Sequence, residues 1–533
     1  MSQLLFDAVS NITLRADKSD RKMLCDTFVN VGQLMTILMS NNSHVLFGRR
    51  GTGKTHVLEY LRSKCDEKGD CPIYVDLRTI GSSCSVYFDT NIPLTQRVAR
   101  LVIDVFQEIN DQILTFIAAD DARKELYLHE VTPLVEKIRK AICSRQLHGS
   151  RIVETSDTIQ NDSESAQGFG VGLDSASLEI NGKESKKTKY ERKETIQGCD
   201  MYYVHFPAVS SLYKEIMDKL ENVHIIVMLD EFSEIPLELQ PYLADMLRRS
   251  LVAVRGITLK FGAIEHRTCL KKVKNEREYV GLEIGADCFS CNLDEYMVFN
   301  NNQDQSLDFF RSLLYKHVNN ELSDSEKIDN PEKLVRLLFS GEDAFREWVR
   351  AAEGVPRDAF NILNKAVAID YKSNKVTLPS IRKGAKVWYN EDKETSLSAY
   401  PHAIELMHWI VDKVIGKRHA RAFLLENSIK NELIDNLYDS RVLHIIKTNV
   451  SGREEPGRRY NAYAIDYGCY CNLINTQKAP TNLFQSDQKS SANTNTHDML
   501  WEVPQDDYRS IRRAVLNLEA FEEHKKTAIR ENL

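Results

Sequence analysis

The sequence predicts an α/β protein with a mostly parallel sheet, followed by a smaller α+β domain. Three apolar runs predict strands of the sheet, at residues 44–47, 72–78 and 223–231, with helical patterns between them. Strands that alternate with helices along a chain usually form a parallel sheet. Two later strand-like runs, at residues 442–447 and 460–467, follow a helical stretch, and this order predicts the second domain.

Length and composition limit the classes of protein that fit. The chain has 533 residues, which is long for one core and suggests roughly two to four domains. Hydrophobic residues make up 42% and charged residues 28%, as in ordinary soluble globular proteins. Lys and Arg total 70 against 77 for Asp and Glu, a formal net charge of −7. The chain as a whole therefore does not attract nucleic acid, and any DNA binding must come from a local basic patch.

The sequence also bears on where the protein acts. Its first residues lack the basic region and apolar core of a signal peptide, and no uninterrupted apolar run of about 18 residues occurs. The 11 cysteines are scattered, a pattern typical of reduced thiols rather than of a disulfide framework. We therefore expect a cytoplasmic protein with no membrane partner.

Residues 48–55, GRRGTGKT, match the phosphate-binding motif G-x-x-x-x-G-K-[ST] between a strand-like run and a helical one. The glycines let the backbone turn tightly and aim its N–H groups at phosphate oxygens. Lys54 supplies a charge for the β and γ phosphates, and Thr55 offers a hydroxyl to Mg²⁺. A glycine-rich turn without function is the alternative. The predicted nucleotide-binding residues are Gly48, Arg49, Arg50, Gly51, Thr52, Gly53, Lys54, Thr55 and His56.

The apolar run at residues 223–229 ends in Asp230 and Glu231. Such a run is typical of a buried central strand, which delivers its last residues to the edge of the sheet where ligands bind. Asp230 would complete a Mg²⁺ shell with Thr55, and Glu231 would polarise the water that attacks the γ phosphate. Together with the phosphate-binding motif, this acid pair predicts a Walker B site.

Two further segments are candidates for sensing the phosphate. The strand-like run at residues 257–264 should lie beside the acid-bearing strand, with its polar exit at residues 265–267 facing the γ phosphate. Arg357 starts a later helix, and an arginine there can reach the phosphates and distinguish ATP from ADP. The alternative is that Arg357 pairs only with a nearby carboxylate. We take Glu231, Lys54 and Arg357 as the catalytic candidates.

Composition shifts divide the chain into parts. A polar segment at about residues 145–200 can bury little apolar surface, so we expect a mobile or hairpin-forming insertion there. Residues 371–399 are polar and should form a joint between domains. The expected parts are an α/β ATPase domain over residues 1–300, a helical lid over 301–375, a winged-helix domain over 395–475, a linker over 476–498 and a C-terminal helix over 499–533.

The second domain has the pattern of a winged helix. Residues 403–443 show a three-helix pattern, and the two strand-like runs that follow would form its β-hairpin. The turn between them carries Arg453, Arg458 and Arg459, which could contact the phosphates of double-stranded DNA. Glutamates in the same turn dilute this charge, so a protein contact or a solvated hairpin is an equal alternative.

The two ATPase motifs, the sensor strand, the lid motif at residues 354–357 and the winged helix occur in an order that resembles origin-recognition-type AAA+ ATPases. More closely, the chain is similar to a group of uncharacterised prokaryotic ATPases assigned to that clade. The strings that match are FGRRGTGKT (47–55), YVDLRTIG (74–81), LDEFSEIPLELQPYLADMLRRSL (229–251) and AYAIDYGCY (462–470). The resemblance implies an AAA+-like P-loop NTPase fold with a helical lid and a C-terminal winged helix, and ATP and Mg²⁺ as cofactors.

The resemblance also implies roles for single residues. It gives Lys54 and Thr55 to phosphate and Mg²⁺, Asp230 and Glu231 to Mg²⁺ and water, and the lid sensor to Arg357. One departure concerns the first sensor, where AAA+ members usually carry a small polar residue and this chain has EHR at 265–267. In this respect the chain resembles signalling STAND ATPases, which carry a basic residue at that position. The candidates for a trans arginine finger are Arg248, Arg249 and Arg277.

Our leading hypothesis is an ATP-hydrolysing AAA+ switch or motor that acts on or near DNA. The resemblance implies replication initiation, transposition or defence against mobile DNA as its setting. ATP would bind between the α/β domain and the lid, and would drive homo-oligomerisation or binding of a partner protein. The rival is a STAND-like signalling scaffold with slow turnover, which oligomerises when a trigger binds. A regulator that binds nucleotide without hydrolysing it is disfavoured by the presence of Glu231.

Overall fold

The computed structural model of the protein describes residues 2–81, 85–142, 144–155, 192–203, 205–275, 278–294, 303–415, 422–451, 457–474 and 514–531. The chain forms two compact units. One comprises Met1–Ile80 with Glu221–Leu533, and the other comprises Gly81–Leu220.

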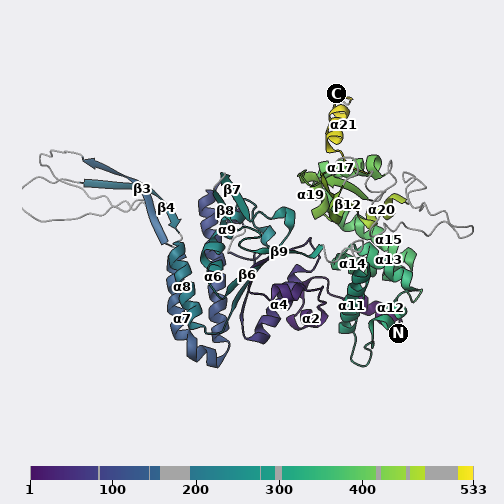
Figure 1. The fold of residues 1–533 in the computed structure, drawn as a ribbon, viewed down its shortest axis with the longest axis horizontal. Coiled ribbons are helices and arrows are strands. Elements are labelled where there is room, and N and C mark those ends of the chain that lie inside the picture. Colours follow the sequence, from purple (N-terminus) through teal and green to yellow (C-terminus); the bar gives the residue numbers. More distant parts are fainter. Residues whose placement is uncertain are drawn as a thin grey trace, which may run out of the picture. The chain divides into compact units, whose positions relative to one another are not determined.

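The first unit contains a five-stranded parallel sheet with the strand order β2, β5, β6, β1 and β9 (Figure 1). The strands are β1 (His44–Phe47), β2 (Cys71–Asp76), β5 (Ile225–Asp230), β6 (Ile257–Ala263) and β9 (Phe289–Asn292). Every residue of β1, β5 and β6 is buried, which explains their nearly unbroken apolar sequences. The predicted parallel sheet is confirmed, as is the pairing of the sensor strand with the acid-bearing strand.

Helices of the N-terminal segment pack against this sheet. Helix α4 (Lys54–Lys68) follows β1, shares a core with α3 (Leu34–Leu38) and contacts α2 (Arg21–Thr27). Phe28, Leu58 and Met228 are buried in that core. After β5 come α9 (Gln240–Leu247) and then, beyond β6, the antiparallel pair β7 (Lys271–Asn275) and β8 (Glu278–Gly281).

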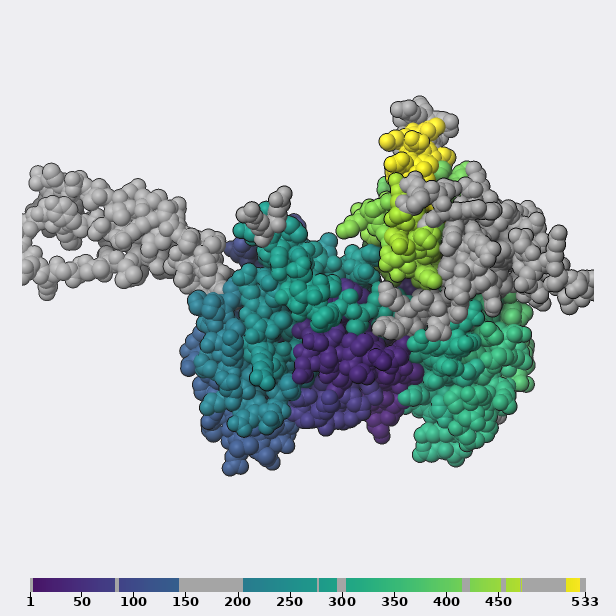
Figure 2. All heavy atoms as spheres, viewed as in Figure 1, coloured from purple at the N-terminus to yellow at the C-terminus, as the bar shows by residue number. Residues whose placement is uncertain are grey.

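The lid is a group of helices with its own core. Its helices are α11 (Gln303–Glu321), α12 (Pro331–Leu338), α13 (Glu342–Ala352), α14 (Pro356–Ile369) and α15 (Leu378–Trp388). Trp348 is completely buried in this core, and α1 (Ser2–Asn11) packs into it through Leu5 and Phe6. Figure 2 shows N-terminal residues in purple beside lid residues in green. The start of the chain thus belongs to the lid rather than to the sheet.

The sequence interpretation of residues 371–399 as a polar joint is wrong. Helix α15 begins at Leu378 and continues into the π-helical turn η5 (Tyr389–Glu394). Ile381 and Ala385 are buried in the lid core, whereas Arg382 and Lys383 between them are more exposed. The segment is therefore an amphipathic helix, and its high average polarity hid the helical period.

The winged-helix region contains helices and a three-stranded antiparallel sheet in the order β10, β12 and β11. Its elements are α17 (Pro401–Trp409), the turn η6 (Ile410–Ile415), β10 (Ala422–Glu426), α19 (Glu432–Asp439), β11 (Leu443–Ser451) and β12 (Arg459–Ile465). The predicted hairpin is confirmed. The predicted three-helix pattern over residues 403–443 is wrong in its middle, because β10 is a strand paired with β12. A short apolar run of this kind does not distinguish a strand from a buried helix.

The described C-terminal residues lie against this sheet. The amide of Leu424 donates to the carbonyl of Ala514 over 2.8 Å, and the amide of Leu516 donates to the carbonyl of Leu424 over 2.9 Å. Helix α21 (Leu518–Glu531) follows and buries Phe521, whose ring centre is 5.9 Å from that of Trp409. The predicted linker at residues 476–498 lies outside the described residues.

The second unit is mainly helical. Its long helices are α6 (Leu94–Ala118), α7 (Asp121–Ile142) and α8 (Phe206–Lys219). The two ends of the predicted insertion form an antiparallel hairpin, β3 (Ser144–Thr155) and β4 (Arg192–Tyr203), so the hairpin prediction is confirmed at its base. Residues 156–191 lie outside the described part. In neither unit does a described helix combine the length and apolar character that a membrane crossing needs.

Candidate nucleotide-binding site

A cavity of about 650 Å³ lies in the first unit, where the phosphate-binding loop, residues 13–34 and the lid meet. Arg50, Lys54, Thr55, Glu231 and Arg357 all line it, as do the other predicted loop residues from Gly51 to His56. Residues predicted from distant parts of the sequence therefore surround one space. Gly48 and Arg49 lie outside this lining.

The loop joins the end of β1 to the start of α4. Gly51 and Gly53 have φ angles of 89° and 97°, in the left-handed region that favours glycine. At Gly51, a Cβ atom would also lie 2.8 Å from the Cβ of Arg357. The glycine at this position therefore allows both the turn of the loop and the close approach of the lid.

Lys54 is almost completely buried at the start of α4. Its Nζ donates to the carbonyl of Gly48 over 2.7 Å and to that of Arg49 over 3.2 Å. Burial lowers the pKa of Lys54, and the negative charges of Glu231 and Asp230 oppose this shift. An anion in the cavity would further stabilise the charged form of this lysine.

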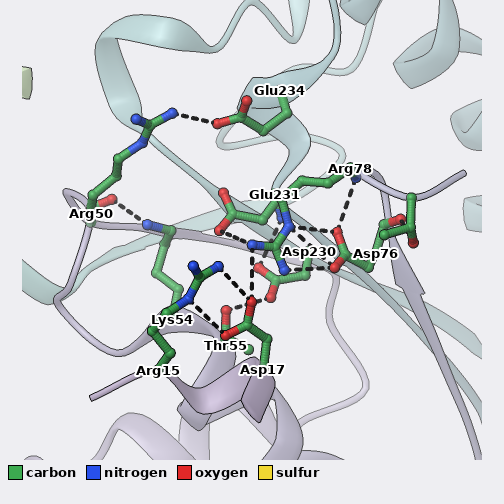
Figure 3. A network of polar contacts seen from close by, with 12 residues as sticks. Arg15, Asp17, Arg50, Lys54, Thr55, Asp76, Arg78, Asp230, Glu231 and Glu234 are labelled. Carbon is green, nitrogen blue, oxygen red and sulfur yellow. Dashed lines mark hydrogen bonds and ion pairs between the residues drawn. The ribbon is translucent and has the colours of Figure 1, made fainter. Parts of the chain in front are cut away.

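The Asp230 carboxylate is completely buried and accepts three hydrogen bonds. Figure 3 shows Asp230 beside one of the donors, Thr55. Its Oδ2 accepts from Thr55 Oγ1 over 2.6 Å and from the Tyr74 hydroxyl over 2.7 Å, and its Oδ1 accepts from the Glu231 amide over 2.9 Å. Burial raises the pKa of Tyr74, and the charge of Asp230 raises it further, so the phenol keeps its proton and donates. Hydroxyl and carboxylate oxygens are the kind of ligand that Mg²⁺ prefers.

Glu231 stands at the carboxyl end of β5 with a φ of 54°, an uncommon conformation for a residue other than glycine. Burial raises the pKa of Glu231, and the charge of Lys54 opposes this shift. Arg78 Nη1 lies 3.9 Å from Glu231 Oε1, and Arg78 also pairs with Asp76 over 2.7 Å and with Asp17 over 3.6 Å (Figure 3). The carboxylate of Glu231 thus faces the cavity between two cations.

Arg357 lies in the first turn of α14, and its amide donates to the carbonyl of Gly51 over 3.3 Å. Burial lowers the pKa of its guanidinium, and the charge of Arg441 adds to this effect. The buried Nε atom of Arg357 has no hydrogen-bond partner among the described residues. A cation in this position can interact with an anion in the cavity.

The sequence matches the ORC-CDC6-like family over residues 13–347, a range that contains the phosphate-binding loop and the acid pair. The chain belongs to this family. The resemblance to origin-recognition-type AAA+ ATPases is therefore confirmed. The matched range ends before Arg357, so family membership itself does not assign that residue.

Two solved structures are similar to this ORC-CDC6-like chain. The Orc1 protein of Aeropyrum pernix, solved in complex with DNA, is 13% identical, with 86% of this chain and 96% of that chain covered and a TM-score of 0.30. Cdc6p from Pyrobaculum aerophilum is 10% identical, with 88% and 96% covered and a TM-score of 0.28. At these TM-scores neither structure adds to the site geometry. No protein with a curated description matches the chain.

The far end of the cavity in this ORC-CDC6-like protein is largely apolar. It is lined by Leu24, Phe28, Leu313, His317 and Phe360. His56 connects this end to the loop, with its Nε2 2.6 Å from the carbonyl of Leu24. Burial lowers the pKa of His317 to about 3, so its ring is neutral. A neutral, apolar compartment beside the loop has the character that a nucleobase requires.

The predicted position of residues 265–267 is wrong. They form the 3-10 helix η4 (Glu265–Arg267), and none of them lines the cavity. Arg267 Nε lies 2.8 Å from Asp439 Oδ2 on α19, whereas Glu265 accepts a hydrogen bond from Asn292 Nδ2 over 3.0 Å at the end of β9. The local cause is Ile264, whose amide donates to Ser233 Oγ over 2.6 Å and whose carbonyl accepts from Thr268 Oγ1 over 2.6 Å. These contacts turn the chain away from the cavity directly after β6.

The two described candidates for an arginine finger, Arg248 and Arg249, do not line the cavity of their own chain. Arg248 and Arg249 both pair with Asp245, over 2.8 and 2.7 Å. Arg277 lies outside the described residues. A finger that acts on a second copy of the chain stays a prediction for these residues.

Sequence reasoning missed Tyr74, Arg78 and Glu234. Arg78 could have been predicted, because it follows β2 and parallel strands end at the same edge of the sheet. Tyr74 could not, because a tyrosine in an alternating strand does not reveal its partner. Glu234 lines the cavity and pairs with Arg50 over 2.7 Å, a contact that depends on how the chain turns after Glu231.

Proposed function

We propose that the protein binds ATP with Mg²⁺ and hydrolyses it, and that this cycle acts as a switch on or near double-stranded DNA. The supporting observation is the convergence of Lys54, Thr55, Glu231 and Arg357 on one cavity, with Asp230 hydrogen-bonded to Thr55. Membership of an AAA+ ATPase family agrees with this proposal.

The shape of the cavity suggests how ATP lies in it. The triphosphate would lie along residues 50–55, where loop N–H groups and Lys54 are available. The base would occupy the apolar end beside Phe28 and Phe360. Arg357 would then approach the γ phosphate from the lid, which gives the lid a contact that ATP supplies and ADP lacks.

The residues at the loop fit a Mg²⁺ ion. Mg²⁺ usually takes only one or two oxygens from a protein and the rest from phosphates and water. The Thr55 hydroxyl and the Asp230 carboxylate, 2.6 Å apart, supply such a pair. When bound, Mg²⁺ would neutralise charge on the β and γ phosphates.

Glu231 is the proposed base. Its carboxylate lines the cavity and can orient a water for in-line attack on the γ phosphate. Burial raises its pKa, which makes it a better proton acceptor than an exposed carboxylate. The charges of Lys54 and Arg78 oppose that rise in pKa.

We assign the DNA contact to the wing, the hairpin of β11 and β12. Arg458 and Arg459 are exposed there, and Arg458 pairs with Glu426 over 3.3 Å. Arg453 lies outside the described residues. Helix α19 is a poor candidate because it carries Glu432, Asp435 and Asp439 and faces η4.

One observation favours the STAND-like alternative. The winged helix is hydrogen-bonded to the phosphate-binding loop itself: Arg49 Nη1 of the loop lies 2.7 Å from Nδ1 of His444 on β11. A scaffold that stays closed until a trigger binds would need such a contact. In that case turnover would be slow, and the trigger would drive a single round of oligomerisation.

Steady-state ATP hydrolysis with and without duplex DNA separates the two functions, with Lys54→Ala as the inactive control. A rate that DNA stimulates and Lys54→Ala abolishes supports the DNA-linked switch. Tight nucleotide retention without DNA stimulation, together with assembly on a sizing column, supports the scaffold. If the wild type binds no more ATP than Lys54→Ala, both are rejected.

A further inference from the structure

The side chain of Arg49 points away from the nucleotide cavity. It is 1% exposed, and its amide and its Nε both donate to Asp294, over 2.9 and 2.8 Å. Its Nη1 donates to Nδ1 of His444 over 2.7 Å and to the carbonyl of Leu443 over 3.3 Å. The guanidinium also lies 4.9 Å from the centre of the Tyr438 ring. A residue of the phosphate-binding loop is thus anchored in the winged helix.

His444, the winged-helix residue in this contact, is held in one tautomer by its own hydrogen bonds. An arginine can only donate, so Nδ1 of His444 accepts and the ring proton sits on Nε2. That Nε2 lies 3.1 Å from Oδ2 of Asp466, to which it donates. Burial lowers the pKa of His444 to about 3, and the charge of Arg49 contributes, so the ring is neutral. Both ring nitrogens of His444 therefore form hydrogen bonds within the protein.

The buried contacts continue from Asp466 to the lid. Lys393 pairs with Asp466 and with Asp358, and Arg441 also pairs with Asp358. Asp358 directly follows Arg357 on α14. The buried cations Arg49, Lys393 and Arg441 stand against the buried anions Asp294, Asp358 and Asp466. Because an unpaired buried charge is costly, losing one contact disturbs its neighbours.

The carbonyl of Arg49 connects this network to the phosphate-binding lysine. That oxygen accepts from Lys54 Nζ over 3.2 Å and from Thr52 Oγ1 over 2.8 Å. Arg49 therefore holds the winged helix with its side chain and the loop with its backbone. A movement of this residue would shift the lysine that reaches the phosphates.

We propose that Arg49 is a positioning residue that couples the phosphate-binding loop to the winged-helix domain through His444. The proposal rests on ATP binding at this loop, as proposed above. Such coupling is reciprocal, so a docked winged helix that strengthens ATP binding is itself held more tightly when ATP is bound. None of the described winged-helix residues lines the cavity, so they would affect ATP binding from outside it.

The test is a change on the winged-helix side of the contact. His444→Ala removes the acceptor and leaves every cavity residue in place. We expect the Kd of a non-hydrolysable ATP analogue with Mg²⁺, measured by isothermal titration calorimetry, to rise about tenfold. His444→Asn keeps an acceptor for Arg49 and should restore the Kd to within about threefold of the wild type. The matched control, Ile434→Ala, removes a buried apolar side chain from the same domain and should change the Kd less than about twofold.

Hydrogen exchange without nucleotide separates the coupling from ATP binding. The amides of residues 49–53 should exchange faster in His444→Ala than in the wild type or in Ile434→Ala. If the wild type binds no ATP analogue, the proposed function fails while the exchange experiment still decides the coupling. Should His444→Ala not fold, Arg49→Lys makes the same test, because a single ammonium replaces the two guanidinium nitrogens that separately reach Asp294 and His444. Unchanged exchange and affinity, tighter binding, or an equal loss in Ile434→Ala would overturn the proposal.

Discussion

Thr55 Oγ1 donates a hydrogen bond to Asp230 Oδ2 over 2.6 Å, although Thr55 lies in the first turn of α4 and Asp230 ends β5. The strand order brings them together, because β6 alone separates β5 from β1 and all three strands end at the same edge. Gly262 on β6 leaves the path between them open, since a Cβ there would lie 2.4 Å from Asp230 Oδ1. The contact between the loop and the acid therefore depends on a strand that contributes no functional side chain.

Tyr74→Phe should raise the Mg²⁺ requirement. The change removes the hydroxyl that donates to Asp230 Oδ2 over 2.7 Å. Partners that orient a metal ligand are worth about 10- to 100-fold in metal affinity. We expect the Mg²⁺ concentration for half-maximal ATP binding to rise by about tenfold, as measured by titration calorimetry. Tyr242→Phe on α9 is the control, and equal requirements in the two variants would contradict this role.

Arg357→Met should weaken ATP binding without weakening the fold. The buried guanidinium has an Nε without a partner among the described residues, so the folded protein bears the cost of its charge. A methionine fills similar space without charge. We expect Tm without nucleotide to stay the same or rise, and the increase in Tm on adding ATP with Mg²⁺ to shrink. Arg346→Met on α13 should leave that increase intact, and a full ATP response in Arg357→Met would show that the lid arginine does not contact nucleotide.

The parts of the site that could be predicted are those in which one short segment determines both fold and chemistry. Lys54 and Thr55 follow a strand and glycines, and Asp230 ends an apolar run, so their positions follow from local sequence. Arg49 occupies a variable position of the motif, and its partner Asp294 comes from another strand end. A pattern within one segment does not reveal such a contact. Tyr74 escaped prediction for the same reason.

The errors in the fold also have physical causes. The strand β10 has the sequence AFLLE, a short apolar run that fits a buried helix as well as a strand. Its pairing with β12 decides the outcome, and that pairing is a tertiary contact. His266 and Arg267 turn to the winged helix because Ser233 and Thr268 bind the backbone of Ile264. Neither contact was visible in the order of residues along the chain.

The contact between η4 and α19 should depend on pH through His266. Burial would lower the pKa of this histidine, but Asp439 and Asp435, each 3.7 Å from the ring, raise it above 6.5. The protonated ring therefore stabilises the fold below pH 6.5, and this contribution is lost as the pH rises through the raised pKa. The urea midpoint of His266→Gln should fall below that of the wild type at acidic pH and approach it at alkaline pH. A difference that grows with rising pH would refute this assignment.

Arg458→Ala with Arg459→Ala should weaken binding to duplex DNA regardless of its sequence. Each exposed arginine on the wing can neutralise one phosphate. Losing both should reduce the slope of log K against log salt by about 2. Fluorescence anisotropy at several salt concentrations measures this slope. Lys372→Ala with Lys383→Ala removes the same charge from the lid, and the same slope change there would show that only net charge matters.

Turnover by Glu231→Gln tests the central claim most directly. The side chain keeps its size but can no longer accept a proton, so kcat should fall by at least about 100-fold. The Kd for ATP should stay within about threefold, because Lys54 and Thr55 are unchanged. Glu215→Gln, an exposed change on α8, serves as the control. Retained ATP with abolished turnover is the predicted result, and turnover equal to that of the wild type would contradict Glu231 as the base.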